Sequence, residues 1–79
     1  MIDENRVRAS KTLSIILEKT IDPATNPMRG NMAKWDSLKH IELILMLEDE
    51  FNIRFSTEEV NAIRSLDDIV EKIKVKNGS

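Results

Sequence analysis

Residues 35–51 read WDSLKHIELILMLEDEF, and this stretch determines the fold. Its apolar residues recur at helical spacing. A helix would gather His40, Ile44, Leu47 and Phe51 on a single face, flanked by Leu43 and Ile41. Asp36 suits the N-cap, because its carboxylate can accept hydrogen bonds from the unpaired backbone N–H groups of the first turn. The stretch therefore predicts a helix that begins at Asp36, ends near Phe51 and buries that face in a core.

The upstream residues predict another amphipathic helix, from about Asp3 to Lys19. Its buried stripe follows the i, i+4, i+7, i+8 spacing of one helix face: Ala9, Leu13, Ile16 and Leu17. The Asp22-Pro23 pair is expected to end this helix, because proline disfavours the helical conformation at the residue before it.

A long loop over residues 21–35 is expected between these two helices. It contains both prolines of the chain and one of its two glycines. A connection of this length usually packs with apolar anchors of its own or has a function. The expected anchors are Ile21, Met28, Met32 and Trp35, with Trp35 holding the loop against the helix that follows.

The downstream residues predict two further helices. Ser56 and Glu59 form an S-x-x-E capping box, in which each side chain satisfies the backbone N–H of the other residue. A short third helix is therefore expected to start at Ser56. Ser65 and Asp68 have the same spacing at the start of a fourth helix, whose apolar stripe is Leu66, Ile69, Val70 and Ile73.

These elements predict an all-α fold, a four-helix bundle with three long helices and one short third helix. Residues 52–55 are too few for a convincing strand and are expected to bridge two helices. The whole chain, residues 1–79, is expected to form one domain, with a frayed tail at 76–79.

The composition excludes several classes of function. The chain has 79 residues, no cysteine, one histidine and a formal net charge of −2. Disulfides, cysteine-based zinc sites, thiol nucleophiles and a histidine-rich metal site are therefore excluded. A nucleic-acid partner is not expected, because the charge lacks a concentrated basic face. With no signal-peptide core and no apolar run of the ~20 residues that span a bilayer, we expect a soluble, cytoplasmic protein. We also expect a monomer.

The negative charge is concentrated on the helix at residues 36–51, which carries five acids and one base, a net −4. Glu42 and Asp49 share a stripe that borders Leu38 and Leu45, with Met46 beside it. A run of charge is most often a solvated face. Large apolar residues next to acids on an outward face instead favour a surface that binds a partner.

Ser37 lies where the long loop becomes the acidic helix. An anionic group attached to its hydroxyl, such as a phosphate ester, would be stabilised by the unpaired N–H groups and the positive end of the helix dipole. The triplet Asp36-Ser37-Leu38 is a weak motif by itself, since a serine at a helix start is usually only a cap.

The wider context of this triplet resembles the acyl carrier protein family. The similarity covers the first amphipathic helix, the long loop, the Asp-Ser-Leu junction, the Leu-Glu-Asp-Glu-Phe end of the second helix, the capped short helix and the Leu-Asp-Asp-Ile-Val of the last helix. The resemblance implies that Ser37 is the serine to which a transferase attaches 4′-phosphopantetheine from coenzyme A. It also implies that Asp36 helps present this serine to the transferase and its magnesium ion.

The resemblance further implies a non-catalytic carrier, which holds acyl intermediates as thioesters on that arm. Its partners would be a phosphopantetheinyl transferase (holo-synthase), an acyl-loading ligase and acyl-processing enzymes of fatty acid biosynthesis, polyketide synthesis or a specialised branch of lipid metabolism. Their docking surface on this chain would consist of Leu38, Glu42, Leu45, Met46, Glu48 and Asp49. Met28 and Met32 would either fill the core or form a flexible wall around the acyl chain.

Three departures from the family pattern favour a specialised pathway. The net charge of −2 is small, Lys39 stands where many members have an acid, and Lys34 and Trp35 replace small residues.

Other interpretations remain open. An enzyme with Ser37 as nucleophile and His40 as base is disfavoured, because the helical rotation turns His40 toward the core and no third group orients it. An unmodified helical interaction module explains the acidic and apolar face equally well. Peptidyl and aminoacyl carriers share both the four-helix plan and the modified serine.

Overall fold

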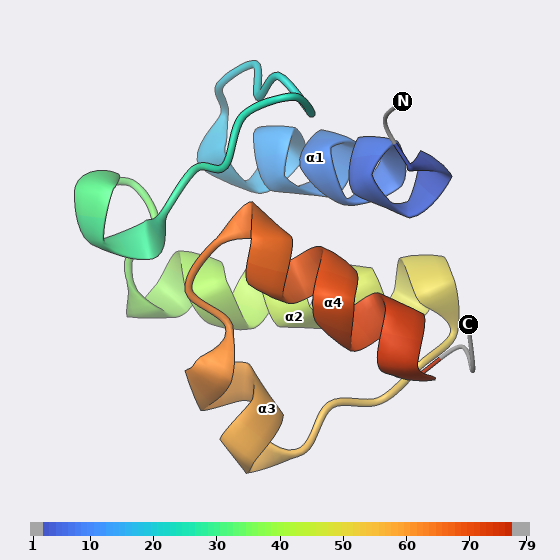
Figure 1. The fold of residues 1–79 in the computed structure, drawn as a ribbon. Coiled ribbons are helices and arrows are strands. Elements are labelled where there is room, and N and C mark those ends of the chain that lie inside the picture. The colour runs from blue at the N-terminus through green and yellow to red at the C-terminus, as the bar shows by residue number, and fades with distance from the viewer. Residues whose placement is uncertain (1–2, 77–79) are drawn as a thin grey trace.

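The all-α prediction is confirmed by the computed structural model, which describes residues 3–76. Within these residues the elements are four α-helices and one 3₁₀ turn, with no named strand: α1 (Glu4–Leu17), η1 (Arg29–Asn31), α2 (Ser37–Phe51), α3 (Thr57–Ala62) and α4 (Leu66–Lys76). α1 packs against both α2 and α4 (Figure 1). α1 and α2 run antiparallel, since Arg8 near the start of α1 donates to the Glu50 carbonyl near the end of α2 at 2.9 Å.

The core is formed by one face of each long helix. All four residues of the predicted stripe on α1 are buried, and so are five of the six predicted on α2. The exception is Ile41, which is 50% exposed. Its position next to the exposed Leu38 and Leu45 makes it part of the outward apolar surface of α2, so its assignment to the core was wrong.

The end of α1 differs from the prediction. The helix stops at Leu17, because Glu18 takes the left-handed conformation with φ 53°. The Glu18 and Lys19 backbone N–H groups then donate to carbonyls of the last turn, Ile15 at 3.4 Å and Ser14 at 3.1 Å. This backbone arrangement is a common C-terminal cap. The Asp22-Pro23 pair therefore does not end the helix, because the chain has already turned five residues earlier.

The long loop is fixed to the start of α4 by backbone hydrogen bonds. The Arg29 N–H donates to the Arg64 carbonyl at 2.7 Å, and the Leu66 N–H donates to the Pro27 carbonyl at 3.1 Å. These two bonds create an isolated antiparallel bridge between Met28 and Ser65. Sequence periodicity could not indicate either this bridge or the η1 turn that follows it, because both join single residues rather than repeating patterns.

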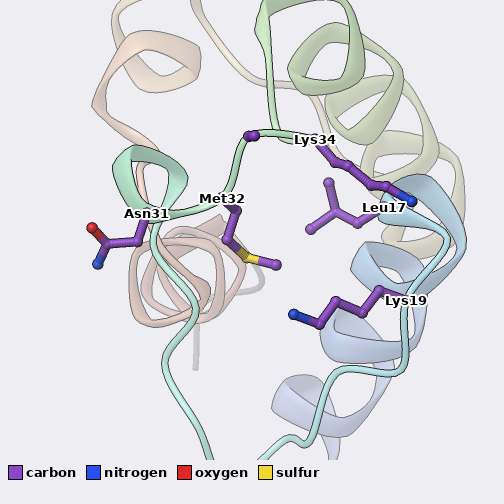
Figure 2. Close-up of a pocket in the computed structure, with 6 residues that line it drawn as sticks. Leu17, Lys19, Asn31, Met32 and Lys34 are labelled. Carbon is purple, nitrogen blue, oxygen red and sulfur yellow. The ribbon is translucent and has the colours of Figure 1, made fainter.

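The expected loop anchors are only partly confirmed. Ile21 and Trp35 are buried, and Met32 packs against the core. Met28 is 47% exposed and does not anchor the loop through its side chain. Figure 2 shows a pocket in which Met32 faces Leu17 across the gap between the loop and the end of α1, with the Lys19 and Lys34 side chains at its edge. Met32 therefore fills space beside the core and also lines an open surface.

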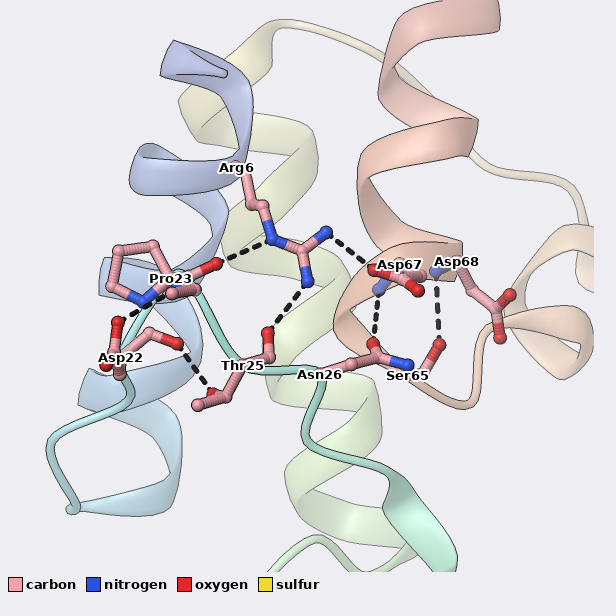
Figure 3. A network of polar contacts seen from close by, with 9 residues as sticks. Arg6, Asp22, Pro23, Thr25, Asn26, Ser65, Asp67 and Asp68 are labelled. Carbon is pink, nitrogen blue, oxygen red and sulfur yellow. Dashed lines mark hydrogen bonds and ion pairs between the residues drawn. The ribbon is translucent and has the colours of Figure 1, made fainter. Parts of the chain in front are cut away.

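Arg6 joins α1, the loop and α4 through its guanidinium group (Figure 3). Its Nε and Nη2 donate to the carbonyls of Pro23 and Thr25 at 2.6 and 2.7 Å, and its Nη1 pairs with the Asp67 carboxylate at 2.6 Å. The Asn26 amide oxygen accepts the Asp67 backbone N–H at 2.8 Å. The side chains of Arg6 and Asn26 thus hold the first half of a loop that has almost no secondary structure.

The caps of the last two helices follow the sequence closely. The capping box of Ser56 and Glu59 is complete, and Glu59 also pairs with Lys76 at 2.8 Å. Hydrogen bonds from Lys76 and from the Ser56 backbone lower the pKa of Glu59 to about 2. At the start of α4, the Asp68 N–H donates to Ser65 Oγ, while the Asp68 carboxylate accepts the Arg64 N–H instead of completing a second box.

The prediction of a frayed tail at residues 76–79 was wrong for Lys76. Lys76 belongs to α4, and residues 77–79 lie outside the described residues. Among the described helices, none combines the length and the apolar character that crossing a membrane requires.

Replacing Arg6 by methionine should lower the free energy of unfolding by about 1–3 kcal/mol. Methionine keeps much of the aliphatic volume but leaves the carbonyls of the loop and the Asp67 carboxylate without their donor. Urea unfolding followed by circular dichroism measures this loss. Lys11→Met on the same helix is the control, because Lys11 is exposed. Equal stabilities of the two variants would contradict the role assigned to Arg6.

Candidate functional site

Ser37 is the first residue of α2 and is exposed. The preceding residue, Asp36, is the N-cap, and its Oδ1 accepts the Lys39 backbone N–H at 2.9 Å. This cap satisfies one of the unpaired donors of the first turn. The Ser37 hydroxyl is therefore free of the capping role that a serine at a helix start usually has.

Arg29 extends from the η1 turn toward the same hydroxyl. Its Nη2 donates to Ser37 Oγ at 3.4 Å, a long hydrogen bond. Sequence reasoning missed this residue, since Arg29 lies eight positions before Ser37 in a loop without periodicity. The backbone bond between Arg29 and Arg64 brings a second guanidinium-bearing residue to this side of the serine.

A pocket lies beside the serine, lined by Arg29, Gly30, Trp35 and Arg64. Neither guanidinium group forms an ion pair within 4 Å among residues 3–76, in which the ion pairs are made by other basic residues: Arg6, Arg8, Lys39 and Lys76. The surface on the loop side of Ser37 is therefore basic and uncompensated.

Trp35 anchors the end of the loop as expected, and it does so through a hydrogen-bond chain. Its indole N–H donates to His40 Nδ1 at 3.0 Å, and His40 Nε2 lies 2.8 Å from the Val60 carbonyl oxygen. The indole can only donate and the carbonyl can only accept, so His40 is neutral with its proton on Nε2. Both ring nitrogens are thus occupied away from Ser37, which leaves no nitrogen to act as its base.

Burial lowers the pKa of His40 below its ordinary value of 6.5, and the positive charge of Arg29 lowers it further. The hydrogen bond to the Val60 carbonyl opposes this change by favouring the protonated form. Desolvation is the largest of these effects, so the neutral ring fits the tautomer that the hydrogen bonds require.

The outward face of α2 carries three large apolar side chains. Leu38, Ile41 and Leu45 are 67%, 50% and 60% exposed. Two predicted acids accompany them: Asp49 is exposed, and Glu42 is half-buried and lies 3.7 Å from Lys39. We call these five residues the α2 outer face: Leu38, Ile41, Glu42, Leu45 and Asp49.

The other two residues of the predicted docking surface are partly structural. Met46 is half-buried and packs against the core. Glu48 is half-buried, and its Oε2 accepts the Phe55 backbone N–H at 2.9 Å, which caps the connection between α2 and α3. No sequence periodicity could show this bond, because it joins a helix to an irregular segment.

The described part of the chain holds no cluster of three or more His, Asp or Glu side chains that could bind a metal ion. The groups that meet around Ser37 are an exposed serine, two arginines and an acidic, apolar helix face.

Residues 33–73 match the family model described as "Phosphopantetheine attachment site". This segment contains Ser37, all of α2 and α3, and most of α4. The chain is also similar to a curated relative, an acyl carrier protein of Syntrophus aciditrophicus (strain SB), with 43% identity over 42 residues. That match spans 53% of this chain and 52% of the relative, about half of each.

Stability should decrease as the pH falls below 6.5. The lowered pKa of His40 means that the unfolded chain binds this proton more readily than the folded chain does. The stabilisation that the neutral His40 ring provides is therefore complete above pH 6.5, its ordinary pKa. It is lost as the pH falls from 6.5 toward the lower pKa of His40 in the folded chain. Urea midpoints at about pH 7.5 and about pH 5.5 measure the effect.

His40→Gln provides the comparison, because an amide does not titrate in this range. The variant is expected to be less stable at every pH, but its stability should change less between these two pH values. An equal change of the urea midpoint between the two pH values in both proteins would show that a group other than His40 causes the loss of stability.

Proposed function

Because the chain belongs to the acyl carrier protein family, we propose that it holds acyl groups as thioesters on a 4′-phosphopantetheine arm attached to Ser37. The observation that carries this assignment is the exposed hydroxyl of Ser37 at the first position of α2, inside the matched segment. The chain passes its cargo between partner enzymes and catalyses no step itself.

The surroundings of Ser37 fit such a group. The phosphate of the arm is bonded to a serine oxygen and carries a negative charge, which the N–H groups at the start of α2 stabilise. Arg29 supplies a cation at 3.4 Å from the same oxygen. Ser37 is exposed, so a transferase can approach it.

Each neighbouring residue has a defined task in this proposal. Asp36 caps α2 with Oδ1, which keeps the serine at the helix start, and it presents the serine to the transferase and its magnesium ion. Trp35 and His40 fix the backbone on both sides of the serine. When attached, the arm supplies a terminal thiol that carries the acyl group.

The α2 outer face is the proposed docking surface for the transferase, the acyl-loading ligase and the acyl-processing enzymes. Exposed leucines beside carboxylates suit basic partner surfaces with apolar rims. Glu48 and Met46 contribute less than the sequence suggested, since Glu48 is bonded to the Phe55 N–H and Met46 packs inward. The small net charge and Lys39 favour partners of a specialised pathway over those of bulk fatty acid biosynthesis.

Incubation with coenzyme A, magnesium and a broad-specificity phosphopantetheinyl transferase should raise the intact mass by about 340 Da. Peptide mapping is expected to locate the gain on Ser37, and Ser37→Ala should abolish it. The helical content of the variant should stay unchanged, because Asp36 provides the cap. A chain that gains no mass, with a transferase active on a control carrier, would contradict the carrier function and favour an unmodified interaction module.

Reversal of charge on the α2 outer face should slow this modification. Glu42→Lys and Asp49→Lys are each expected to reduce kcat/KM of the transferase about 3–10-fold at low salt, with a smaller effect at high salt, because the acids steer the encounter. Glu71→Lys on α4 is the matched control, since it makes the same charge change at an exposed position of another helix. An equal reduction of kcat/KM in the control would show that the α2 outer face is not the docking surface.

A further inference from the structure

The pocket beside Ser37 has the properties of an anion site. It has a volume of about 280 Å³ and is lined by Arg29, Gly30, Trp35 and Arg64. A Cβ atom built at Gly30 would meet no atom within 4 Å, so the space above this residue is open. The buried Trp35 forms a fixed wall, because it is 2% exposed and hydrogen-bonded to His40.

The backbone holds the two arginines of this pocket close to each other. The Arg29 N–H donates to the Arg64 carbonyl at 2.7 Å, next to the bridge between Met28 and Ser65. Two guanidinium groups at neighbouring backbone positions repel each other. Neither has a carboxylate within 4 Å in the described range 3–76.

Carboxylates close in sequence to Arg64 and to the serine already accept other hydrogen bonds. Asp67 pairs with Arg6 at 2.6 Å. Asp68 Oδ2 accepts the Arg64 backbone N–H at 3.0 Å, and Asp36 Oδ1 accepts the Lys39 N–H at 2.9 Å. The pair of arginines therefore offers positive charge to a ligand rather than to the protein itself. Guanidinium groups bind phosphate oxygens with two parallel hydrogen bonds, which makes them well suited to a phosphodiester.

We propose that Arg29 and Arg64 form an internal binding site for the phosphodiester of the arm on Ser37. This inference rests on the proposed function. The Arg29 guanidinium already reaches Ser37 Oγ at 3.4 Å, and the phosphorus of the arm is one covalent bond beyond that oxygen. The arginines are positioning residues, which direct the start of the arm toward the loop and away from the α2 outer face.

The site has a consequence for docking. A phosphodiester neutralised by the carrier's own arginines presents less negative charge to a partner enzyme. The acids of the α2 outer face then determine the orientation of the encounter, since Glu42 and Asp49 follow the serine along α2, whereas the loop precedes it.

Nuclear magnetic resonance on the full chain tests the proposal, with protein labelled with ¹⁵N-arginine and compared before and after complete modification. The expected result is a shift of the Arg29 and Arg64 Nε–Hε signals upon modification and no shift of the Arg54 signal. Arg54 is an internal control, because it follows the opposite end of α2 and its Nη1 bonds to the neighbouring Ile53 carbonyl.

The ³¹P signal of the arm gives a second readout. Arg29→Gln should move this signal, whereas Arg54→Gln should leave it at the wild-type position. In the modified Arg29→Gln protein, the shift of Arg64 should be reduced or lost. Intact mass establishes in each case that the modification is complete.

The possible failures are distinguishable. A protein that gains no mass overturns the carrier function and this site together. A protein that carries the full mass gain on Ser37, with unchanged Arg29 and Arg64 signals and the same ³¹P position in Arg29→Gln, overturns the arginine site alone.

Discussion

The hydrogen-bond chain from Trp35 through His40 to Val60 is the constraint on which the functional end of the molecule depends. It joins the last residue of the loop before the cap, the first turn of α2 and the backbone of α3. An indole N–H at one end and a carbonyl at the other allow only a neutral imidazole between them. Ser37 lies between Trp35 and His40 in sequence, so this buried polar network fixes the backbone on both sides of the serine. A buried network of this kind is rigid when every member is satisfied.

This constraint divides the surroundings of Ser37 into two sides of opposite charge. On the loop side, Arg29 and Arg64 are brought together by the backbone bridge at residues 28 and 65. On the helix side, Glu42 and Asp49 accompany exposed apolar side chains. The net charge of −2 does not show this difference between the two sides, because opposite charges cancel in the total while remaining separate on the surface. The modest total charge of the chain is therefore compatible with a strongly acidic helix face.

The sequence was sufficient to predict the periodic apolar stripes and the helix caps. The stripes of α1, α2 and α4, the capping box at Ser56 and the N-cap at Asp36 all depend on residues close together in the chain. The structure contains each of them, except that Ile41 of the α2 stripe is exposed. The features that were missed join distant residues through single contacts. Arg6 holds the loop from 17 and 19 positions away, Arg29 reaches the serine across eight, and Glu48 bonds a backbone N–H seven residues later. No periodic pattern encodes such contacts. The end of α1 was also predicted wrongly. A proline such as Pro23 is a recognisable helix-ending residue, whereas nothing in the sequence marks Glu18 as the residue that takes the left-handed conformation.

The two halves of the loop are held by different contacts. Arg6 and Asn26 fix its first half to α1 and α4, and the bonds at Pro27 and Arg29 fix its second half to the start of α4. Except for the Asn26 amide, which accepts through its side chain, these attachments use polar groups of the loop backbone that would otherwise have to be satisfied by water. A carrier needs a modification site that partners can reach and that nevertheless keeps one geometry from one encounter to the next. An exposed serine on a helix start provides the access, and a loop bonded along its length provides the constancy. Movement between enzymes can then come from the attached arm and from docking, without a rearrangement of the fold.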